Sequence, residues 1–111
     1  VKSGIFSREL ESWGLEAITP SSQRQADVMS LIFDNIKANI PADMEKFHAV
    51  RQELQEKGAQ AIILGCTELS LIKRDYAIGA GFVDAMEVLA QQAVLQCGMP
   101  LKAEFRSLIS K

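Results

Sequence analysis

The chain has 111 residues, of which 48% are hydrophobic and 23% are charged, and its formal net charge is −2. This size and balance are typical of one globular domain with an ordinary core, and they argue against collagen-like, disordered and disulfide-rich classes. No apolar run approaches the roughly 20 residues of a membrane-spanning helix, and no basic patch favours nucleic acid or an anionic membrane as a partner.

The N-terminal half of the chain is predicted to hold three helices and one strand. Apolar residues at helical spacing mark the helices, and a short alternating run that stops at Pro20 marks the strand. In chain order we expect a helix at 3–13, a strand at 15–19, a long helix from 22 to 38 or 39, and a helix from 41 to 57. Ser21 and Ser22 are N-cap candidates for the long helix, and Pro41 disfavours its continuation.

The C-terminal half is predicted to alternate strands with helices. Its almost unbroken apolar run is typical of a central parallel strand that is buried on both faces. The expected elements are a strand at 59–64, a helical turn from Thr67, a loop at 76–81, a strand at 81–84, a helix at 85–96 and a final helical segment at 101–110. We expect the helix at 85–96 to bury Val88, Leu89, Ala93 and Val94.

Strands separated by helices indicate an α/β fold. We expect three layers, in which helices flank a small, mostly parallel sheet. Because three strands make a narrow sheet, one of its edges is expected to lie against a partner or another lobe.

The two cysteines, Cys66 and Cys97, are expected to be free thiols. The chain has no CxxC pair and its single histidine, His48, stands alone, so no metal site is predicted. The first residues lack the apolar core of a signal peptide, which favours a reducing, cytoplasmic location. Cys97 ends a helix in apolar company and is expected to fill the core, whereas His48 is expected at or near the surface.

Cys66 is the first candidate for chemistry because it follows the apolar strand and Gly65. Ligands of open α/β sheets bind just past the carboxyl ends of the strands. If a helix begins at Thr67, its free N–H groups would stabilise an anion and lower the pKa of the Cys66 thiol. Such a thiolate could act as a base or a nucleophile, and the Thr67 hydroxyl could bind a carboxylate. The alternative is that Cys66 is a small buried core residue.

Residues 61–69, Ala-Ile-Ile-Leu-Gly-Cys-Thr-Glu-Leu, resemble the second cysteine motif of aspartate/glutamate racemases. Weaker matches to the family pattern follow one another in the expected order. They are Ser3 to Phe6 at a helix start, Gly14-Leu15-Glu16, Pro20, Gln25 to Lys37, Lys57-Gly58-Ala59 and Asp84. The resemblance covers residues 1–98.

The resemblance implies a cofactor-independent amino-acid racemase that uses two cysteines and no pyridoxal phosphate. One thiolate takes the α-proton, and the opposite thiol returns a proton to the other face of the carbon, which is what inversion requires. By this resemblance Cys66 is the second of the two bases, and Thr67 contacts the substrate carboxylate beside it.

The resemblance also implies roles for Lys37 and Glu68. Lys37 matches a lysine that helps to bind a substrate carboxylate, and its alternative is a cation that closes a helix C-terminus. Glu68 would orient the site or the substrate ammonium group, and its alternative is a first-turn acid that complements the helix dipole. Glutamate racemases usually have histidine at the position of Glu68, so the aspartate-type branch is favoured.

Residues 1–98 are accordingly expected to form the C-terminal lobe of a two-lobed racemase, and residues 99–111 a C-terminal extension. The first cysteine of the family lies in the other lobe, so the isolated chain is expected to be inactive. Its expected partners are a missing N-terminal lobe, a small amino-acid or dicarboxylate substrate, and a second full-length chain in a homodimer. The alternative is a non-catalytic carboxylate-binding or assembly domain that reuses the fold.

Overall fold

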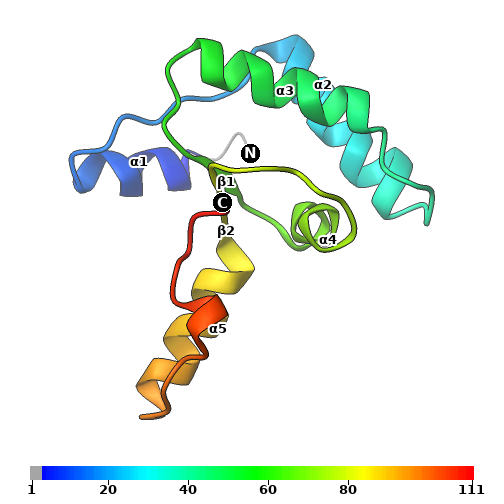
Figure 1. Ribbon diagram of the computed structural model, residues 1–111. Helices are drawn as coiled ribbons and strands as arrows, with labels where there is room; N and C mark the ends of the chain where they lie inside the picture. Colours follow the sequence, from blue (N-terminus) through cyan, green and yellow to red (C-terminus); the bar gives the residue numbers. More distant parts are fainter. Residues whose placement is uncertain (1–3) are drawn as a thin grey trace.

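The computed structural model describes residues 4–111, in which helices flank a two-stranded parallel sheet (Figure 1). The elements in chain order are α1 (Ile5–Ser12), α2 (Ser22–Ser30), the π-helix η1 (Leu31–Ile36), α3 (Met44–Glu56), β1 (Ile62–Leu64), α4 (Thr67–Asp75), β2 (Phe82–Asp84), α5 (Ala85–Gln96) and the 3-10 turn η2 (Ala103–Phe105). The predicted α/β class, with helices flanking a small parallel sheet, is confirmed. Ser3, the predicted start of the first helix, lies outside the described residues.

The sheet has two strands within the described part of the chain, with Ile62 opposite Phe82 and Leu64 opposite Asp84. The predicted strand at 15–19 is wrong: this segment has no regular secondary structure, and the sheet of the described residues contains only β1 and β2. Its first N–H, that of Leu15, instead closes the end of α1 by donating to Leu10 O at 3.0 Å.

The predicted helical segment at 101–110 is also wrong except for the single turn η2. Residues after this turn run back to the sheet, where Ile109 forms an isolated antiparallel bridge with Val83. Ser110 N donates to Phe82 O at 2.8 Å, and Gly81 N donates to Ser110 O at 3.0 Å. These long-range backbone hydrogen bonds satisfy the free edge of β2 and override a weak local helical pattern.

The long helix predicted from residue 22 is present, but its second part is a π-helix. Ser21 is the N-cap and accepts a hydrogen bond from Arg24 N. The i→i+5 pattern reaches Lys37, whose N–H donates to Ile32 O at 2.9 Å. The helical path ends near Asn39, which has a left-handed φ of 57°, as the sequence predicted. The wider turn rotates Lys37 relative to where a regular α-helix would place it.

The core lies between the sheet and the helices on one side of it. Its most deeply buried side chains are Leu31, Phe47, Leu64, Ile72, Ile78 and Phe82. Phe47 on α3 stacks on Phe82 of β2 with ring centroids 5.5 Å apart. This packing fixes β2, and therefore the position of Asp84 at its end.

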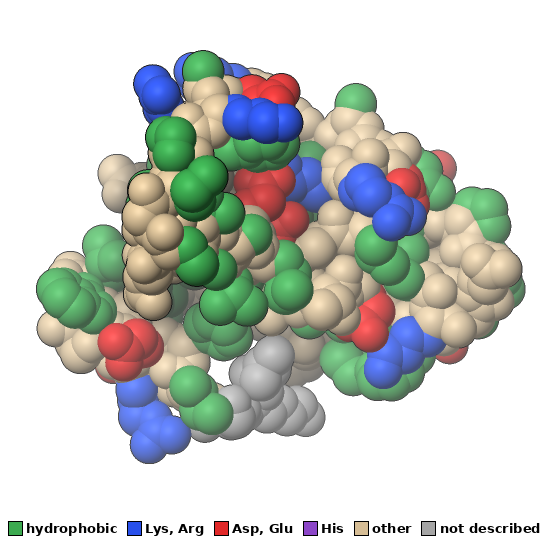
Figure 2. Space-filling view, turned by 90° about the horizontal axis from the view of Figure 1, so that it is seen from below, with side chains coloured by type: hydrophobic (Ala, Val, Ile, Leu, Met, Phe, Trp, Pro, Cys, Tyr) green, Lys and Arg blue, Asp and Glu red, His purple; other side chains and the backbone are tan. Residues whose placement is uncertain are grey.

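Helix α5 has the predicted bounds but not the predicted burial. It projects away from the sheet (Figure 1), and none of its residues is buried. Leu89 is 63% exposed, and Cys97 at the helix end is exposed too, so the predictions that they fill the core are wrong. The face seen in Figure 2 is the one toward which α5 points in Figure 1, and hydrophobic side chains are accordingly frequent on it. His48 is exposed, as predicted.

No helix within residues 4–111 combines the length and the apolar character that crossing a membrane would require.

Glu53 of α3 joins this helix to the N-terminus of α2. Its two carboxylate oxygens accept hydrogen bonds from Ser21 N at 2.8 Å and from Ser21 Oγ at 2.6 Å. These bonds, then the nearby Lys57 and Arg24, hold the pKa of Glu53 below its ordinary value of 4.5.

Glu53 is therefore expected to make stability depend on pH in the acid range. A carboxyl group whose pKa is lowered by folding stabilises the fold above its unfolded pKa and loses that contribution as pH falls through the folded value. Thermal unfolding should show a midpoint that falls below about pH 4.5, and Glu53→Gln should flatten that dependence. Exposed Glu56→Gln on the same helix is the matched control, and an equal effect of both substitutions would contradict the assignment.

Candidate active site

Cys66 lies at the junction between β1 and α4, at the carboxyl end of the parallel strand. It is the N-cap residue of α4, with an extended backbone at φ −145° and ψ 165°. The helix begins at Thr67, as the sequence predicted. Gly65 does not need a left-handed backbone here, and a Cβ at this position would make ordinary contact with the ring of Phe6 at 3.6 Å.

The Cys66 thiol is half-buried and stands near the first-turn amides of α4. Burial raises the pKa of Cys66 and is the largest influence, while the Leu69 N–H lowers it and the Glu68 charge raises it. The predicted lowering of the thiol pKa is therefore wrong for this chain. Its side chain accepts no capping hydrogen bond of ordinary geometry, so the amides offset the loss of hydration only in part.

The other predicted site residues gather around the same helix start. Lys37 Nζ, from the end of η1, lies 3.7 Å from Glu68 Oε1, and Thr67 Oγ1 donates to Glu68 Oε2 at 3.0 Å. Lys37 Nζ also lies 4.7 Å from the centre of the Phe33 ring. The structure thus brings Lys37, Thr67 and Glu68 together beside Cys66, although they come from two separate elements.

Glu68 links this group electrostatically. Its own backbone N–H, the Thr67 hydroxyl and the Lys37 cation lower the pKa of Glu68. The protonated Cys66 thiol also faces this carboxylate, which raises the pKa of Cys66 and lowers that of Glu68. Glu68 is therefore charged at neutral pH and partly neutralises Lys37. Because the Lys37 side chain is 49% exposed, it has the freedom to turn from Glu68 toward a bound anion.

Two further polar side chains form hydrogen bonds next to the Cys66 loop, which is the connection at residues 65–66 between β1 and α4. Asp84 at the end of β2 accepts a hydrogen bond from Ser70 Oγ at 2.5 Å, and Ser70 Oγ also lies 3.1 Å from Cys66 O. The sequence indicated Asp84 only as a family match. Ser70 was missed, since a serine inside a short helix has no pattern that marks it, whereas Asp84 directly before a helix is a recognisable N-cap signal.

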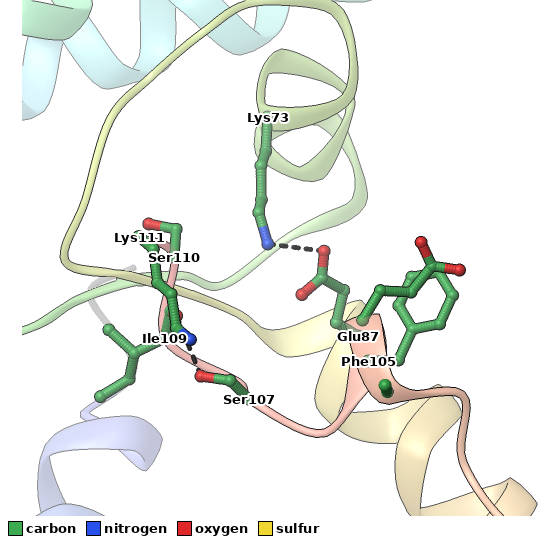
Figure 3. Close-up of a pocket in the computed structure, with 9 residues that line it drawn as sticks. Lys73, Glu87, Phe105, Ser107, Ile109, Ser110 and Lys111 are labelled. Carbon is green, nitrogen blue, oxygen red and sulfur yellow. Dashed lines mark hydrogen bonds and ion pairs between the residues drawn. The ribbon is translucent and has the colours of Figure 1, made fainter.

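Two cavities in the described part of the chain lie apart from this thiol. One, of about 400 Å³, is open to solvent and is lined by residues of α4, α5, η2 and the C-terminal tail (Figure 3). Lys73 of α4 points across it and donates to Glu87 of α5 at 2.5 Å. The other, of about 300 Å³, lies between η1 and the end of α4. Neither is lined by Cys66, Thr67, Glu68 or Lys37.

Within residues 4–111, no three His, Cys, Asp or Glu side chains are grouped so that they could hold a metal ion.

A half-buried thiol lies at the carboxyl end of a parallel strand, with a hydroxyl, a carboxylate and a cation around it, which is where α/β domains bind their ligands. The chain belongs to the Asp/Glu/Hydantoin racemase family, whose profile matches residues 1–93. Membership of this family supports a racemase-type function.

A curated relative is the "Uncharacterized protein in pnlA 3'region" of Pectobacterium carotovorum subsp. carotovorum. The two proteins are 31% identical over 96 residues, which cover 85% of this chain and 64% of the relative. The chain therefore spans less than two thirds of the length of that relative.

Proposed function

We propose that this chain contributes the second cysteine and the adjoining carboxylate contacts of a cofactor-independent amino-acid racemase. The observation that supports this proposal most directly is the grouping of Cys66, Thr67, Glu68 and Lys37 at the start of α4. The family match supports racemisation as the class of reaction. A thiol at a strand–helix junction is a group that can accept or donate a proton in such a reaction.

The proposed reaction moves two protons in opposite senses. A thiolate in the N-terminal lobe takes the α-proton from one face of the substrate, and the Cys66 thiol gives its proton to the other face, which leaves Cys66 as a thiolate. The reverse direction exchanges these roles. A raised pKa of Cys66 suits the donor half of the cycle, because the sulfur must hold a proton before it can deliver one.

The neighbouring groups would orient a dicarboxylic amino acid. Thr67 Oγ1 and the free N–H groups of α4 would bind the carboxylate next to the reacting carbon. Glu68 would attract the ammonium group of the substrate. Lys37 would exchange its ion pair with Glu68 for one with a substrate carboxylate. Glu68 at the position where glutamate racemases usually have histidine favours aspartate over glutamate as the substrate.

The remaining parts of the proposal concern the whole protein. Residues 1–98 would form its C-terminal lobe, and residues 99–111 an extension of that lobe. An N-terminal lobe would supply the first cysteine, the two-lobed chains would pair as a homodimer, and the protein would work in the cytoplasm. Exposed Cys97 would not replace the first cysteine, because it ends α5 on the part of the molecule that projects from the sheet.

The test is a racemisation assay on the whole two-lobed protein without added pyridoxal phosphate. With L-aspartate in deuterated water, we expect loss of the circular dichroism signal together with incorporation of deuterium at the α-carbon, and a slower reaction with L-glutamate. The isolated 111-residue chain is expected to give no turnover. Turnover by the isolated chain would contradict the two-cysteine proposal.

A second candidate function is a non-catalytic domain that binds a small carboxylate or serves in assembly. The raised pKa of the half-buried Cys66 thiol favours it, because less of the thiol is then ionised and able to act as a base. This candidate predicts that the whole protein binds aspartate, as measured by calorimetry, without exchanging its α-proton.

A further inference from the structure

Asp84 is a buried carboxyl group that the proposed reaction does not use. It is 5% exposed and stands at the end of β2, directly opposite Leu64 in the parallel ladder. Its Oδ1 accepts hydrogen bonds from Met86 N at 2.9 Å and from Ser70 Oγ at 2.5 Å. The same oxygen of Asp84 thus caps α5 and accepts a hydrogen bond from α4. Asp84 belongs to β2, which lies beside β1, the strand that leads to Cys66.

Ser70 completes the link from Asp84 to Cys66. Its N–H and its hydroxyl oxygen each lie 3.1 Å from Cys66 O. The hydroxyl has one proton and two acceptors, a carboxylate and a peptide carbonyl, and the charged acceptor binds it more strongly. Ser70 is therefore held by Asp84 while it lies against the peptide group that fixes the direction of the Cys66 side chain.

We propose that Asp84 and Ser70 are positioning residues that hold the Cys66 loop against α4 and so fix the place of the reactive sulfur. This inference rests on the proposed function in that Cys66 is taken as the reacting thiol. A proton transfer to or from carbon depends steeply on geometry, and a misplacement of about 1 Å can cost about 10²-fold in rate.

If Asp84 and Ser70 position Cys66, loss of the Ser70 hydroxyl should change two rates in opposite directions: the alkylation of Cys66 should become faster and turnover slower. Without the Ser70 hydroxyl, the Cys66 loop admits water, and the burial that raises the pKa of the thiol is relieved. A small reagent such as iodoacetamide should then react faster with Cys66 near neutral pH. Turnover should fall at the same time, because the sulfur is less well aimed at the substrate. Unfolding of the chain would also expose Cys66 and lower turnover, so the two rates are compared only between variants whose circular dichroism shows that they are folded.

The first experiment uses the 111-residue chain with Cys97→Ser, so that Cys66 is the only thiol. Ser70→Ala is expected to move the pH profile of iodoacetamide alkylation, followed by mass spectrometry, toward lower pH. At a pH below the pKa, a thiol pKa that is lower by about 1 makes the reaction about tenfold faster, because the thiolate fraction rises in proportion. Ser70→Thr, which keeps the hydroxyl, should restore the parent profile. Ser12→Ala is the matched control, since it removes a hydroxyl bonded to Glu9 O at 2.6 Å far from the site.

Asp84→Asn supplies an independent variant, because it keeps the size and the cap of α5 but removes the charge that holds Ser70. It is expected to move the alkylation profile in the same direction as Ser70→Ala. An unchanged profile in both folded variants, verified by circular dichroism, would overturn the positioning role.

The second experiment measures turnover in the whole protein, where Ser70→Ala should lower kcat about tenfold to 10²-fold with little change in KM. If the whole protein has no racemase activity, the proposed function fails while the alkylation experiment still decides whether Asp84 and Ser70 hold Cys66. If the protein is active and Ser70→Ala leaves kcat unchanged, the positioning inference fails and the proposed function stands.

Discussion

Replacement of Cys66 by serine in the whole protein is expected to lower the racemisation rate by about 10²–10⁴-fold, the range that one positioned acid or base contributes. Serine keeps the shape of the side chain, but a hydroxyl is a far weaker acid than a thiol, whose unperturbed pKa is about 8.5. It therefore cannot alternate between donor and anion near neutral pH. Because inversion in either direction needs a proton moved at each face, the D-to-L and L-to-D rates should fall together.

Cys97→Ser is the matched control, because the same chemical change is made at an exposed cysteine. Its kcat should stay within about twofold of the parent enzyme, since isolated surface substitutions have small effects on the fold. Circular dichroism of both enantiomers followed separately would reveal the difference. A Cys66→Ser enzyme that kept kcat and changed only KM would assign Cys66 to substrate binding and contradict its role as a base.

The central part of the candidate site could be predicted because it is local. A strand, a glycine, Cys66 and a helix start at Thr67 follow one another directly, so sequence order alone places the thiol at a helix N-terminus. The contact between Lys37 and Glu68 depends on tertiary structure as well, because the π-helix η1 sets the direction of Lys37. A family pattern indicated both residues, but no local rule predicted that they would meet.

The pKa of Cys66 shows why electrostatics is harder to predict than position. The sequence indicated the amide groups of α4, which lower a thiol pKa, and it indicated the charge of Glu68. It did not indicate how deeply the sulfur would be buried. Because desolvation is the largest of these influences, the direction in which the pKa moves could be decided only after packing was known.

The errors in the fold have the same origin in tertiary structure. An amphipathic pattern at 85–96 predicted the helix α5 correctly, but it could not say what would cover the apolar face, and Leu89 is exposed in this chain. The tail around Ile109 has a weak helical pattern, yet it pairs with Val83 because β2 presents an open edge. In both places tertiary structure decided the result: no distant segment within residues 4–111 covers the apolar face of α5, whereas β2 offers the tail a strand to pair with.

Phe82→Ala is expected to destabilise the fold by about 3–5 kcal/mol, the usual cost of emptying a buried phenylalanine site. The ring is 1% exposed and stacks on Phe47, while Arg51 lies over it with its guanidinium carbon 5.3 Å from the ring centre. Arg51 Nε is already buried without a hydrogen-bond partner among the described residues. Removal of the ring would leave this cation against an unfilled apolar space, which adds to the cost of the cavity.

Urea denaturation measures this loss, and Phe105→Ala is the control that removes the same atoms from a side chain that is 54% exposed. The control should change the free energy of unfolding by no more than about 0.5 kcal/mol. Because a domain of this size is stable by only about 5–15 kcal/mol, Phe82→Ala should bring β2 close to unfolding. Asp84 ends the same strand, so alkylation of Cys66 should also accelerate in Phe82→Ala and not in Phe105→Ala. Equal stability of the two variants would show that Phe82 does not hold the sheet on which Cys66 depends.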